Sequence, residues 1–221
     1  MSMLQPTPQR MGVDTKAWRT TINLANVVNV FFEYRDIHRI ADVGSVLLIG
    51  VTNGIEAEFL RARGFGVTTF DIDPAFEPDE VGSCDDLSRF GDGQFDFVVA
   101  SHVLEHLPAT RLEAALGEFA RVAHHCLIYV PVGGRYLSLK LLVGTRWQFT
   151  LCFDFIRFWH RPSGIDRIYR SNEHYWEVGY LGFRRSDVRR LLSRYFLVLD
   201  EYRNTEWMPS YNFVLQSNVK K

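Results

Sequence analysis

Two glycines and, further along the chain, one carboxylate have the types and spacing of a ligand site. Gly50 and Gly54 follow an apolar run at Val46–Ile49, and Asp71 ends a second apolar run at Val67–Phe70. Glycines let the backbone approach a ligand closely, and an acid after the second strand can accept hydrogen bonds from both hydroxyls of a ribose. The chemistry that these residues predict is binding of a nucleotide-type cofactor, with Asp71 as the ribose acceptor.

The spacing of the turn argues against a dinucleotide. That fingerprint has the form G-x-G-x-x-G, whereas this turn has the series Gly50, Thr52, Gly54. Together with the downstream run Phe95–Leu107, the chain resembles the class I S-adenosylmethionine-dependent methyltransferases. Their first motif, V-L-(D/E)-x-G-x-G-x-G, maps onto Val46–Gly54, and the resemblance covers about residues 44–132.

Two positions depart from that family pattern. Leu48 stands where the family usually has an acid, which helps to orient the loop around the methionine end of the cofactor. Thr52 stands where the family usually has its middle glycine, so its side chain could crowd the cofactor or donate a hydrogen bond to it. These departures leave open a protein of this fold that binds ligands without catalysis.

The resemblance implies S-adenosylmethionine as the cofactor and S-adenosylhomocysteine as the product. It implies a cofactor site made of Gly50, Val51, Thr52, Asn53, Gly54, Asp71, Ile72, Asp86, Leu87 and Ser101. Asn53 is also expected to cap the helix that follows it. Asp85 and Asp86 both fall where the family places an acid against the adenine amino group, and we prefer Asp86.

Three residues are candidates for catalysis. His102 follows the strand expected at 95–101, beside the place where the resemblance puts the methyl group, and an imidazole is a suitable general base near neutral pH. His174 and Tyr175 lie in a later aromatic segment and could reach the acceptor. The alternatives are that His102 only closes the edge of the sheet and that Tyr175 only packs in that segment.

A metal site is a separate hypothesis. Some members of the family bind a divalent ion through E-x-x-E-H at this place, and here His102, Glu105 and His106 occupy it, with Glu173 or His174 as a further ligand. Metal-free members carry the same stretch, and there the acid and the second histidine anchor the following helix. We therefore predict no metal among the site residues.

Alternation of strand and helix patterns predicts the fold. Expected strands cover 45–50, 67–71, 95–101, 125–131, 196–201 and 211–216, and expected helices cover 53–64, 110–122 and 184–195. Such alternation implies right-handed crossovers and a parallel sheet. With the resemblance, the prediction is an α/β, Rossmann-like, mostly parallel seven-stranded sheet with helices on both faces. N-terminal helices and an aromatic helical cap inserted after the fifth strand would complete it, and the last two strands would form an antiparallel hairpin.

The length of 221 residues suits a single methyltransferase-like domain. Its expected parts are a flexible tail (1–12), N-terminal helices (13–43, with Asp14 as a first cap), a cofactor-binding half (44–134), a substrate cap (135–182), and a C-terminal helix and hairpin (183–221). Residues 133–195 hold 12 Lys/Arg and 5 Asp/Glu, a charge of +7, so the rest of the chain carries −8. A basic, aromatic cap suggests an anionic or ring-bearing acceptor, unless its arginines form only a solvated face.

Composition excludes several classes of protein. The three cysteines are scattered without a C-x-x-C pair, which disfavours a disulfide framework and a zinc-cysteine site. No uncharged apolar run is long enough to span a bilayer, and the first ten residues have no apolar signal core, so we expect a cytoplasmic protein. The segment Leu137–Trp159 also allows contact with a membrane surface or a lipid-linked acceptor, although at helical spacing its apolar residues form no clean stripe.

The sequence therefore predicts an S-adenosylmethionine-dependent methyltransferase that acts on an oxygen or nitrogen of a small-molecule acceptor, by direct in-line transfer. The alternatives are a catalytically inactive binding protein of this fold and a methyltransferase of nucleic acid or protein. For the second alternative, the arginines of the 184–195 helix would be the contact surface. The oligomeric state and the identity of the acceptor do not follow from the sequence.

Overall fold

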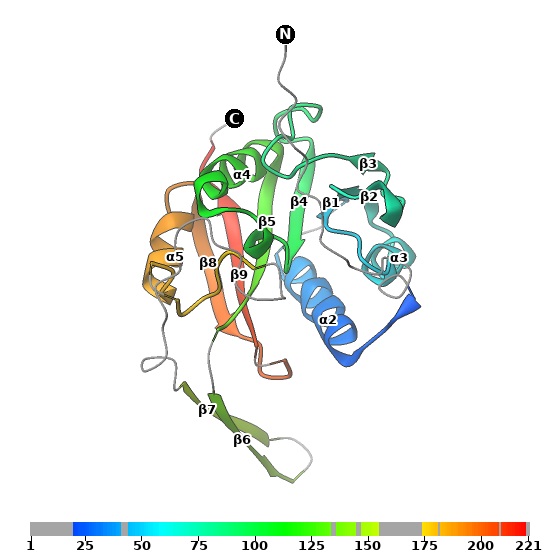
Figure 1. The fold of residues 1–221 in the computed structure, drawn as a ribbon. Helices are drawn as coiled ribbons and strands as arrows, with labels where there is room; N and C mark the ends of the chain where they lie inside the picture. The colour runs from blue at the N-terminus through cyan, green and yellow to red at the C-terminus, as the bar shows by residue number, and fades with distance from the viewer. Residues whose placement is uncertain are drawn as a thin grey trace.

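The computed structural model describes residues 20–40, 44–133, 136–144, 147–154, 174–180, 182–207 and 209–219. The expected cap at Asp14 and the tail at 1–12 lie outside these residues. Within them, the backbone forms one large sheet, four α-helices and a separate two-stranded hairpin (Figure 1).

The large sheet has seven strands in the order β3-β2-β1-β4-β5-β9-β8. The strands are β1 (Ser45–Ile49), β2 (Gly66–Asp71), β3 (Glu80–Val81), β4 (Phe95–Ser101), β5 (Ala123–Pro131), β8 (Phe196–Arg203) and β9 (Ser210–Ser217). Strands β1 to β5 pair in parallel, β9 pairs antiparallel with β5, and β8 pairs antiparallel with β9. The mostly parallel seven-stranded prediction is confirmed, including the antiparallel hairpin at one edge.

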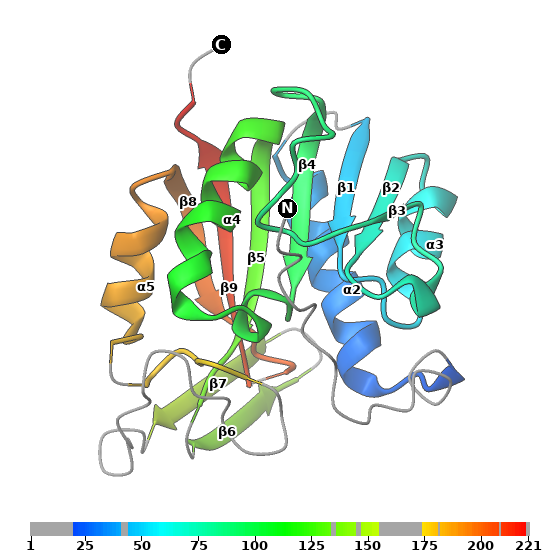
Figure 2. The ribbon, with the colours of Figure 1, turned by 45° about the horizontal axis from the view of Figure 1, so that its top comes forward.

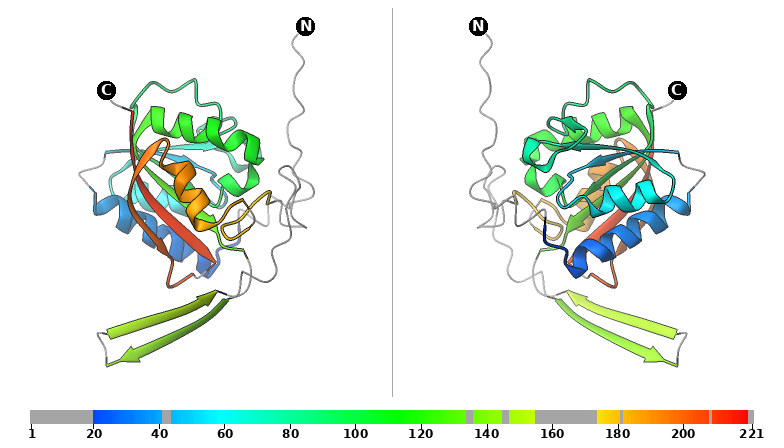
Figure 3. Two further views of the ribbon diagram at one scale, coloured as in Figure 1. Left: turned by 90° about the vertical axis from the view of Figure 1, so that its left-hand side faces the viewer. Right: turned by 90° about the vertical axis from the view of Figure 1, so that its right-hand side faces the viewer.

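Helices cover both faces of this sheet (Figure 2). They are α2 (Leu24–His38), α3 (Ile55–Ala62), α4 (Ala109–Val122) and α5 (Arg185–Leu192), with short 3₁₀ turns η1 (Pro74–Phe76) and η2 (Leu104–His106). Side views show α4 and α5 on one face and α2 and α3 on the other (Figure 3). The helices expected near 53–64, 110–122 and 184–195 are thus present.

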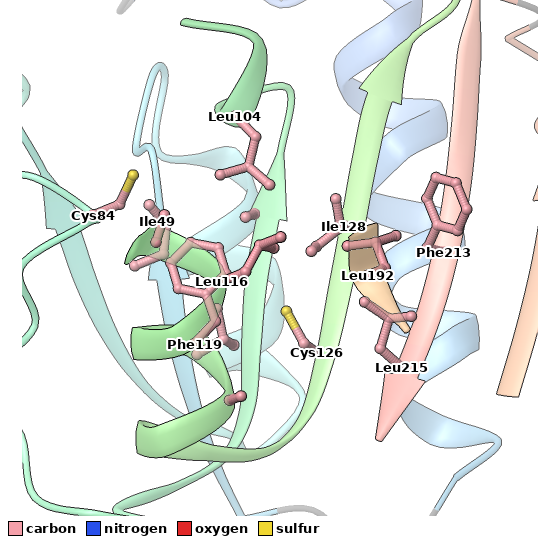
Figure 4. Packing of buried hydrophobic residues seen from close by; sticks show 14 of the residues in the cluster. Ile49, Cys84, Leu104, Leu116, Phe119, Cys126, Ile128, Leu192, Phe213 and Leu215 are labelled. Atoms are coloured by element: carbon pink, nitrogen blue, oxygen red, sulfur yellow. The ribbon is translucent and has the colours of Figure 1, made fainter. Parts of the chain in front are cut away.

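Each face of the sheet has its own core because neighbouring strand residues point to opposite sides. Leu47 and Ile49 of β1 belong to the cluster under α4 and α5, whereas Val46 and Leu48 belong to the cluster under α2 and α3. Figure 4 shows part of the first cluster, in which Leu116 and Phe119 of α4 and Leu192 of α5 pack against side chains of the strands. Burial on both faces explains why these strands are almost continuously apolar.

The expected helical cap is wrong where the structure describes it. Directly after β5, strands β6 (Tyr136–Val143) and β7 (Trp147–Asp154) pair antiparallel as an isolated two-stranded sheet. The physical reason is the pattern of these strands, in which large apolar residues alternate with mostly polar ones with a period of two. Gly144, with φ +63°, begins the turn between them. The rest of the expected cap up to residue 173 lies outside the described residues.

Residues 174–180 return to the body of the protein. Val178 forms a bridge with Val132, and its amide donates to the carbonyl of Pro131 at 2.9 Å. Trp176 is 3% exposed and belongs to the core cluster on the α4 side, where its ring stacks on Phe183. The later part of the predicted cap is therefore built into the core, across the carboxyl ends of β4 and β5.

Candidate functional site

The turn between β1 and α3 has the backbone conformation of a glycine turn. Gly50 has φ +85° and Gly54 has φ +76°, both in the left-handed region that glycine tolerates. A Cβ on Gly50 would lie 2.6 Å from Cγ2 of Val103, so a side chain does not fit there. Thr52 also has a positive φ, +43°, which is unfavourable for a β-branched residue. Thr52 therefore has a glycine-type backbone conformation at the position where the family pattern has a glycine.

Asp71 joins this turn to the end of β2. The side chain is 4% exposed, and its Oδ2 accepts a hydrogen bond from the amide of Val51 at 2.8 Å. Its Oδ1 accepts from the amide of Asp73 at 2.9 Å. Asp73 in turn caps η1 by accepting from the amide of Ala75, as turn chemistry predicts. The expected ribose acceptor is thus fixed against the turn that would hold the rest of the cofactor.

Ile72 and Asn53, which flank these residues, differ in how far their side chains are engaged within the protein. Ile72, next to Asp71, remains 37% exposed although it is a large apolar residue. The side-chain oxygen of Asn53 accepts from the amide of Ile55 at 3.3 Å, and its Nδ2 donates to the carbonyl of Thr21. Gly54 is the N-cap of α3, so Asn53 satisfies the first helical amide from one position earlier.

The acidic loop separates its two aspartates. Asp85 forms an ion pair with Arg111, whereas Asp86 is exposed and accepts from the amide of Ser88 at 3.2 Å. The bonds from Ser88 are the main reason why the pKa of Asp86 is lowered. Asp86 is thus the more accessible of the two acids, and its role against the adenine amino group stays a prediction. Leu87 is a correction, because its side chain is fully buried in the core and its amide donates to Glu118, which leaves neither group for a ligand.

His102 lies at the end of β4 with a left-handed backbone, φ +55°, and its amide donates to the carbonyl of Tyr129. Its Nδ1 is 3.5 Å from Oε1 of Glu105, and its Nε2 is buried without a hydrogen-bond partner among the described residues. Glu105 is 1% exposed. Burial would raise the pKa of this carboxyl, but the hydrogen bond of His102 and the charges of His106 and His174 outweigh burial and lower it.

The cluster that could hold a metal differs from the predicted one. Ligand atoms of Glu105, His106 and His174 all lie within 4.8 Å of one another, and His102 is not part of this group. The rings of His106 and His174 are 4.9 Å apart, and Nδ1 of His174 is 2.8 Å from Oε1 of Glu177. Two imidazoles and one carboxylate are a donor set that divalent transition metals accept. The sequence hypothesis named His102, Glu105 and His106 with Glu173 or His174 as a further ligand, whereas the structure gathers Glu105, His106 and His174 and leaves His102 outside the cluster.

Tyr175 is fixed beside this cluster. Its amide donates to the carbonyl of Glu105 at 2.8 Å, and its side chain packs against the core on the α4 side. The indole of Trp176 donates to the carbonyl of Leu104 at 3.0 Å. The structure therefore brings the segment that carries His174 and Tyr175 onto η2, within the same region as His102.

Sequence reasoning missed a pair of adjacent glutamates on the other side of the turn, of which Glu33 is buried and Glu56 is partly exposed. Glu33 of α2 is completely buried, and neither of its carboxyl oxygens has a hydrogen-bond partner within the part of the chain that the structure describes. Its carboxyl lies against that of Glu56, in the first turn of α3, and close to Ser101 and His102. Burial is the main cause of the raised pKa of both carboxyls, and their mutual repulsion adds to the shift at Glu56. The available signal was that Glu33 interrupts the buried side of a helix between Val30 and Ile37.

The basic helix is mostly paired with acids. Arg185 and Arg189 contact Glu201, Arg190 contacts Asp187, and Arg194 contacts Glu113. Side chains that neutralise one another are typical of a solvated structural face and present little free charge to a polyanion.

Comparisons with known proteins agree with this geometry. Residues 47–125 match the model of a family described as "Methyltransferase domain". No curated protein matches the chain.

Several solved structures share the fold at low sequence identity. The N-methyltransferase NodS from Bradyrhizobium japonicum, in complex with S-adenosylhomocysteine, has 15% identity, a TM-score of 0.58, and coverage of 94% of each chain. An S-adenosylmethionine-dependent methyltransferase from Clostridium acetobutylicum has 9% identity, a TM-score of 0.55, and coverage of 95% of this chain and 94% of its own. The 1,6-didemethyltoxoflavin-N1-methyltransferase of Burkholderia thailandensis has 12% identity, a TM-score of 0.51, and coverage of 88% and 87%.

These likenesses concern the fold, whereas the family match covers the glycine turn, Asp71 and His102. Residues 47–125 thus match a methyltransferase-domain family, and the order of the sheet with the glycine turn at its carboxyl edge is the fold of the S-adenosylmethionine-dependent methyltransferases to which the chain is similar.

Proposed function

We propose that this protein transfers a methyl group from S-adenosylmethionine to an oxygen or nitrogen of a small-molecule acceptor. The observation that carries the proposal is the hydrogen bond between Asp71 and the amide of Val51 in the left-handed turn. It joins a ribose-type acceptor to a glycine-type turn at the carboxyl ends of β1 and β2, which is where open parallel sheets bind nucleotides. The S-adenosylhomocysteine in the NodS structure supports the same choice of cofactor.

Several residues would hold the cofactor. Asp71 accepts from the ribose hydroxyls, Ile72 offers an apolar surface to the adenine, and Asp86 accepts from the adenine amino group. The turn from Gly50 to Gly54 lets the backbone approach the methionine end, whose carboxylate is favoured by the amino end of α3. Ser101 closes the site at the end of β4.

S-adenosylmethionine would supply an activated methyl group on its cationic sulfur, and that sulfur would keep the electron pair of the C–S bond as the leaving group. The protein's part is to align the acceptor oxygen or nitrogen in line with that bond and to exclude water. The acceptor's proton passes to a base. His102 fits this role because Nδ1 faces Glu105, whereas Nε2 has no hydrogen-bond partner among the described residues and is left to accept the proton.

The base hypothesis predicts that His102→Gln lowers turnover by about 10²- to 10⁴-fold, the usual contribution of general base catalysis, with little effect on cofactor affinity. Acceptors are first found by transfer of a radiolabelled methyl group to a compound panel. His174→Gln tests the second candidate base, and His124→Gln, at the opposite end of the sheet, is the control. Full turnover in both His102→Gln and His174→Gln would remove the general-base step from the mechanism.

Cofactor binding is tested by calorimetry with S-adenosylhomocysteine. We expect Asp71→Ala to weaken binding roughly 10- to 100-fold, because hydrogen bonds to a buried carboxylate are lost. Asp73→Ala is the matched control, because this neighbouring acid only caps η1. Equal effects of the two variants would argue against a ribose role for Asp71.

The same titration tests the metal hypothesis. We expect the affinity to be unchanged by EDTA and by added Mg²⁺ or Zn²⁺. A metal-dependent gain that disappears in His106→Ala would instead assign a metal to the cluster of Glu105, His106 and His174.

A binding protein of this fold without catalysis is the second candidate. The buried Leu48 and the left-handed Thr52 favour it, because both depart from the pattern of the cofactor loop. The absence of S-adenosylhomocysteine binding to the unaltered protein would support this candidate. Salt-sensitive binding to RNA or DNA would instead favour a nucleic-acid substrate. The ion pairs that the α5 arginines form with acids argue against this outcome.

A further inference from the structure

The hairpin of β6 and β7 has one face made only of large apolar side chains. Its cross-strand pairs on this face are Leu137–Phe153, Leu139–Leu151, Leu141–Phe149 and Val143–Trp147. Each of these eight side chains is between 48% and 66% exposed. We call this the apolar hairpin face. Adjacent residues along a strand alternate between faces, so the other face carries Tyr136, Ser138, Lys140, Leu142, Gln148, Thr150 and Cys152.

The polar side of the hairpin is the one that contacts the body. Nζ of Lys140 donates to Oε2 of Glu206 at 2.7 Å, and Nε2 of Gln148 donates to Oε1 of the same residue at 3.0 Å. The guanidinium of Arg203 lies 4.8 Å from the centre of the Tyr136 ring. These contacts direct the apolar hairpin face away from the protein, and Figure 3 shows the hairpin lying apart from the layered body.

This arrangement is the reverse of ordinary folding, in which the apolar side of a strand pair faces a core. An isolated two-stranded hairpin is marginally stable in water, and a continuous apolar patch on a surface usually marks an interaction site. The ladder of eight residues per strand is about 25 Å long at roughly 3.3 Å per residue. A surface of this length is suited to a broad, apolar binding partner.

Charge and composition identify that partner. By sequence, the insertion 135–173 contains seven Lys/Arg and three Asp/Glu, and this net charge of +4 favours an anionic over a neutral surface, although Lys140 itself is paired with Glu206 on the polar side of the hairpin. Protein interfaces have only about 56–65% apolar area, whereas the apolar hairpin face has no polar side chain. Trp147 at the turn end is an aromatic residue of the kind enriched at the membrane–water boundary.

We propose that the apolar hairpin face docks on the surface of an anionic lipid bilayer. The hairpin begins five residues after β5 ends, at the same edge of the sheet as Gly50 and His102. Docking therefore places the candidate site next to the membrane surface. No helix among the described residues is long and apolar enough to cross a membrane, so the contact is superficial. This inference does not depend on the proposed methyl transfer.

The test is co-sedimentation of the full chain with unilamellar vesicles of equimolar phosphatidylglycerol and phosphatidylcholine, and with vesicles of phosphatidylcholine alone. We expect binding to the anionic vesicles that weakens with salt and is much lower for the neutral ones. Leu141→Ser should lower the partition coefficient about tenfold, because it removes one large apolar side chain from the bilayer.

Leu142→Ser is the matched control. The two leucines are adjacent in β6 and similarly exposed, 62% and 70%, but they point to opposite faces. We expect Leu142→Ser to change binding by less than about twofold. Melting temperatures of both variants would show that each is folded. Quenching of Trp147 fluorescence by lipids labelled in the acyl chains, compared with Trp147→Phe, would report insertion of the turn end.

Equal effects of Leu141→Ser and Leu142→Ser would overturn the proposal, as would the absence of binding to anionic vesicles. If sedimentation velocity also shows a dimer that Leu141→Ser dissociates, the apolar hairpin face belongs to a second copy of the chain. A monomer without vesicle binding would leave the face to another segment of the same chain. In both cases the S-adenosylhomocysteine titration is unaffected, which keeps this test separate from that of the cofactor site.

Discussion

Single residues at the carboxyl edge of the sheet have backbone conformations that their side chains disfavour. Thr52 and His102 both have positive φ, and each lies where a strand gives way to a turn. A non-glycine residue in this region costs about 1–2 kcal/mol, and such strain tends to concentrate at functional sites. Strain at Thr52 and His102 therefore lowers the free energy of unfolding of the domain.

The buried carboxyls of Glu33 and Glu56 also oppose stability. Two acids that lie together without solvent cannot both ionise at low cost, so at least one is held in its protonated form. Pairs of this kind are common at functional sites because their proton is held in a defined place. Ser101 and His102, which contribute to the environment of Glu33, place the pair beside the candidate site.

We predict that Glu56→Gln stabilises the protein increasingly as pH rises from about 5 to 8. The unfolded chain ionises Glu near pH 4.3, whereas burial raises the pKa of folded Glu56 well above its usual range. The protonated carboxyl thus contributes stability below the unfolded pKa, and this is lost as pH rises through the folded pKa. Glutamine stays neutral at every pH. The difference in the free energy of unfolding between the variant and the unaltered protein therefore grows by about 1.4 kcal/mol for each pH unit between the two pKa values.

Thermal or denaturant unfolding across this pH range measures the effect. Glu58→Gln is the matched control, since this acid lies in the same first turn of α3 but is exposed. A difference between Glu56→Gln and the unaltered protein that does not vary with pH would refute the buried protonated carboxyl.

At the scale of elements, a buried polar network fixes α2 to the sheet. The carboxylate of Asp36 accepts from the hydroxyl of Tyr129 on β5 at 2.7 Å, from Tyr202 on β8, and from its neighbour Arg35. Asn212 of β9 donates to the Tyr202 hydroxyl. Burial is the main reason why the pKa of both tyrosines is raised, and the negative charge of Asp36 adds to it. The network connects the helix that carries Glu33 to three strands.

We predict that Tyr129→Phe lowers the free energy of unfolding by about 1–3 kcal/mol, because it removes one donor from a buried carboxylate. Urea unfolding of the variant provides the measurement. Tyr34→Phe, on the same helix as Asp36 and partly buried, is the control, and we expect a change within about 0.5 kcal/mol. Similar losses in both variants would assign the effect to packing of the rings rather than to Asp36.

The hairpin of β6 and β7 is a segment that was expected to be helical and that forms strands instead. At helical spacing, the apolar residues of 137–153 form no stripe, and their aromatic content suggested a helical cap. At the period of a strand, the same residues form one uniform face, from Leu137 to Phe153. The alternation is present in the sequence, whereas the helical cap was only what the resemblance to the family implied.

At the scale of the whole molecule, the crossovers of a parallel sheet bring distant segments to one edge. The ends of β1, β2 and β4 place Gly50, Asp71 and His102 together, because carboxyl ends of parallel strands share an edge. The hairpin and residues 174–180 follow β5 at that same edge. The turn after β1, the end of β4 and the hairpin of β6 and β7 are therefore gathered at one edge of the sheet (Figure 1).

The sequence by itself determined the large sheet, its helices and the glycine turn. Buried parallel strands must be continuously apolar, and a left-handed turn requires residues such as Gly50 and Gly54, so local composition carries that information. Contacts between segments far apart in the chain were decided only by the tertiary structure. Glu33 meets Glu56, and His174 meets Glu105 and His106, because separate elements pack at one edge. The direction in which the apolar hairpin face points is likewise decided by the tertiary structure. It depends on contacts of Lys140 and Gln148 with Glu206, which no local sequence pattern encodes.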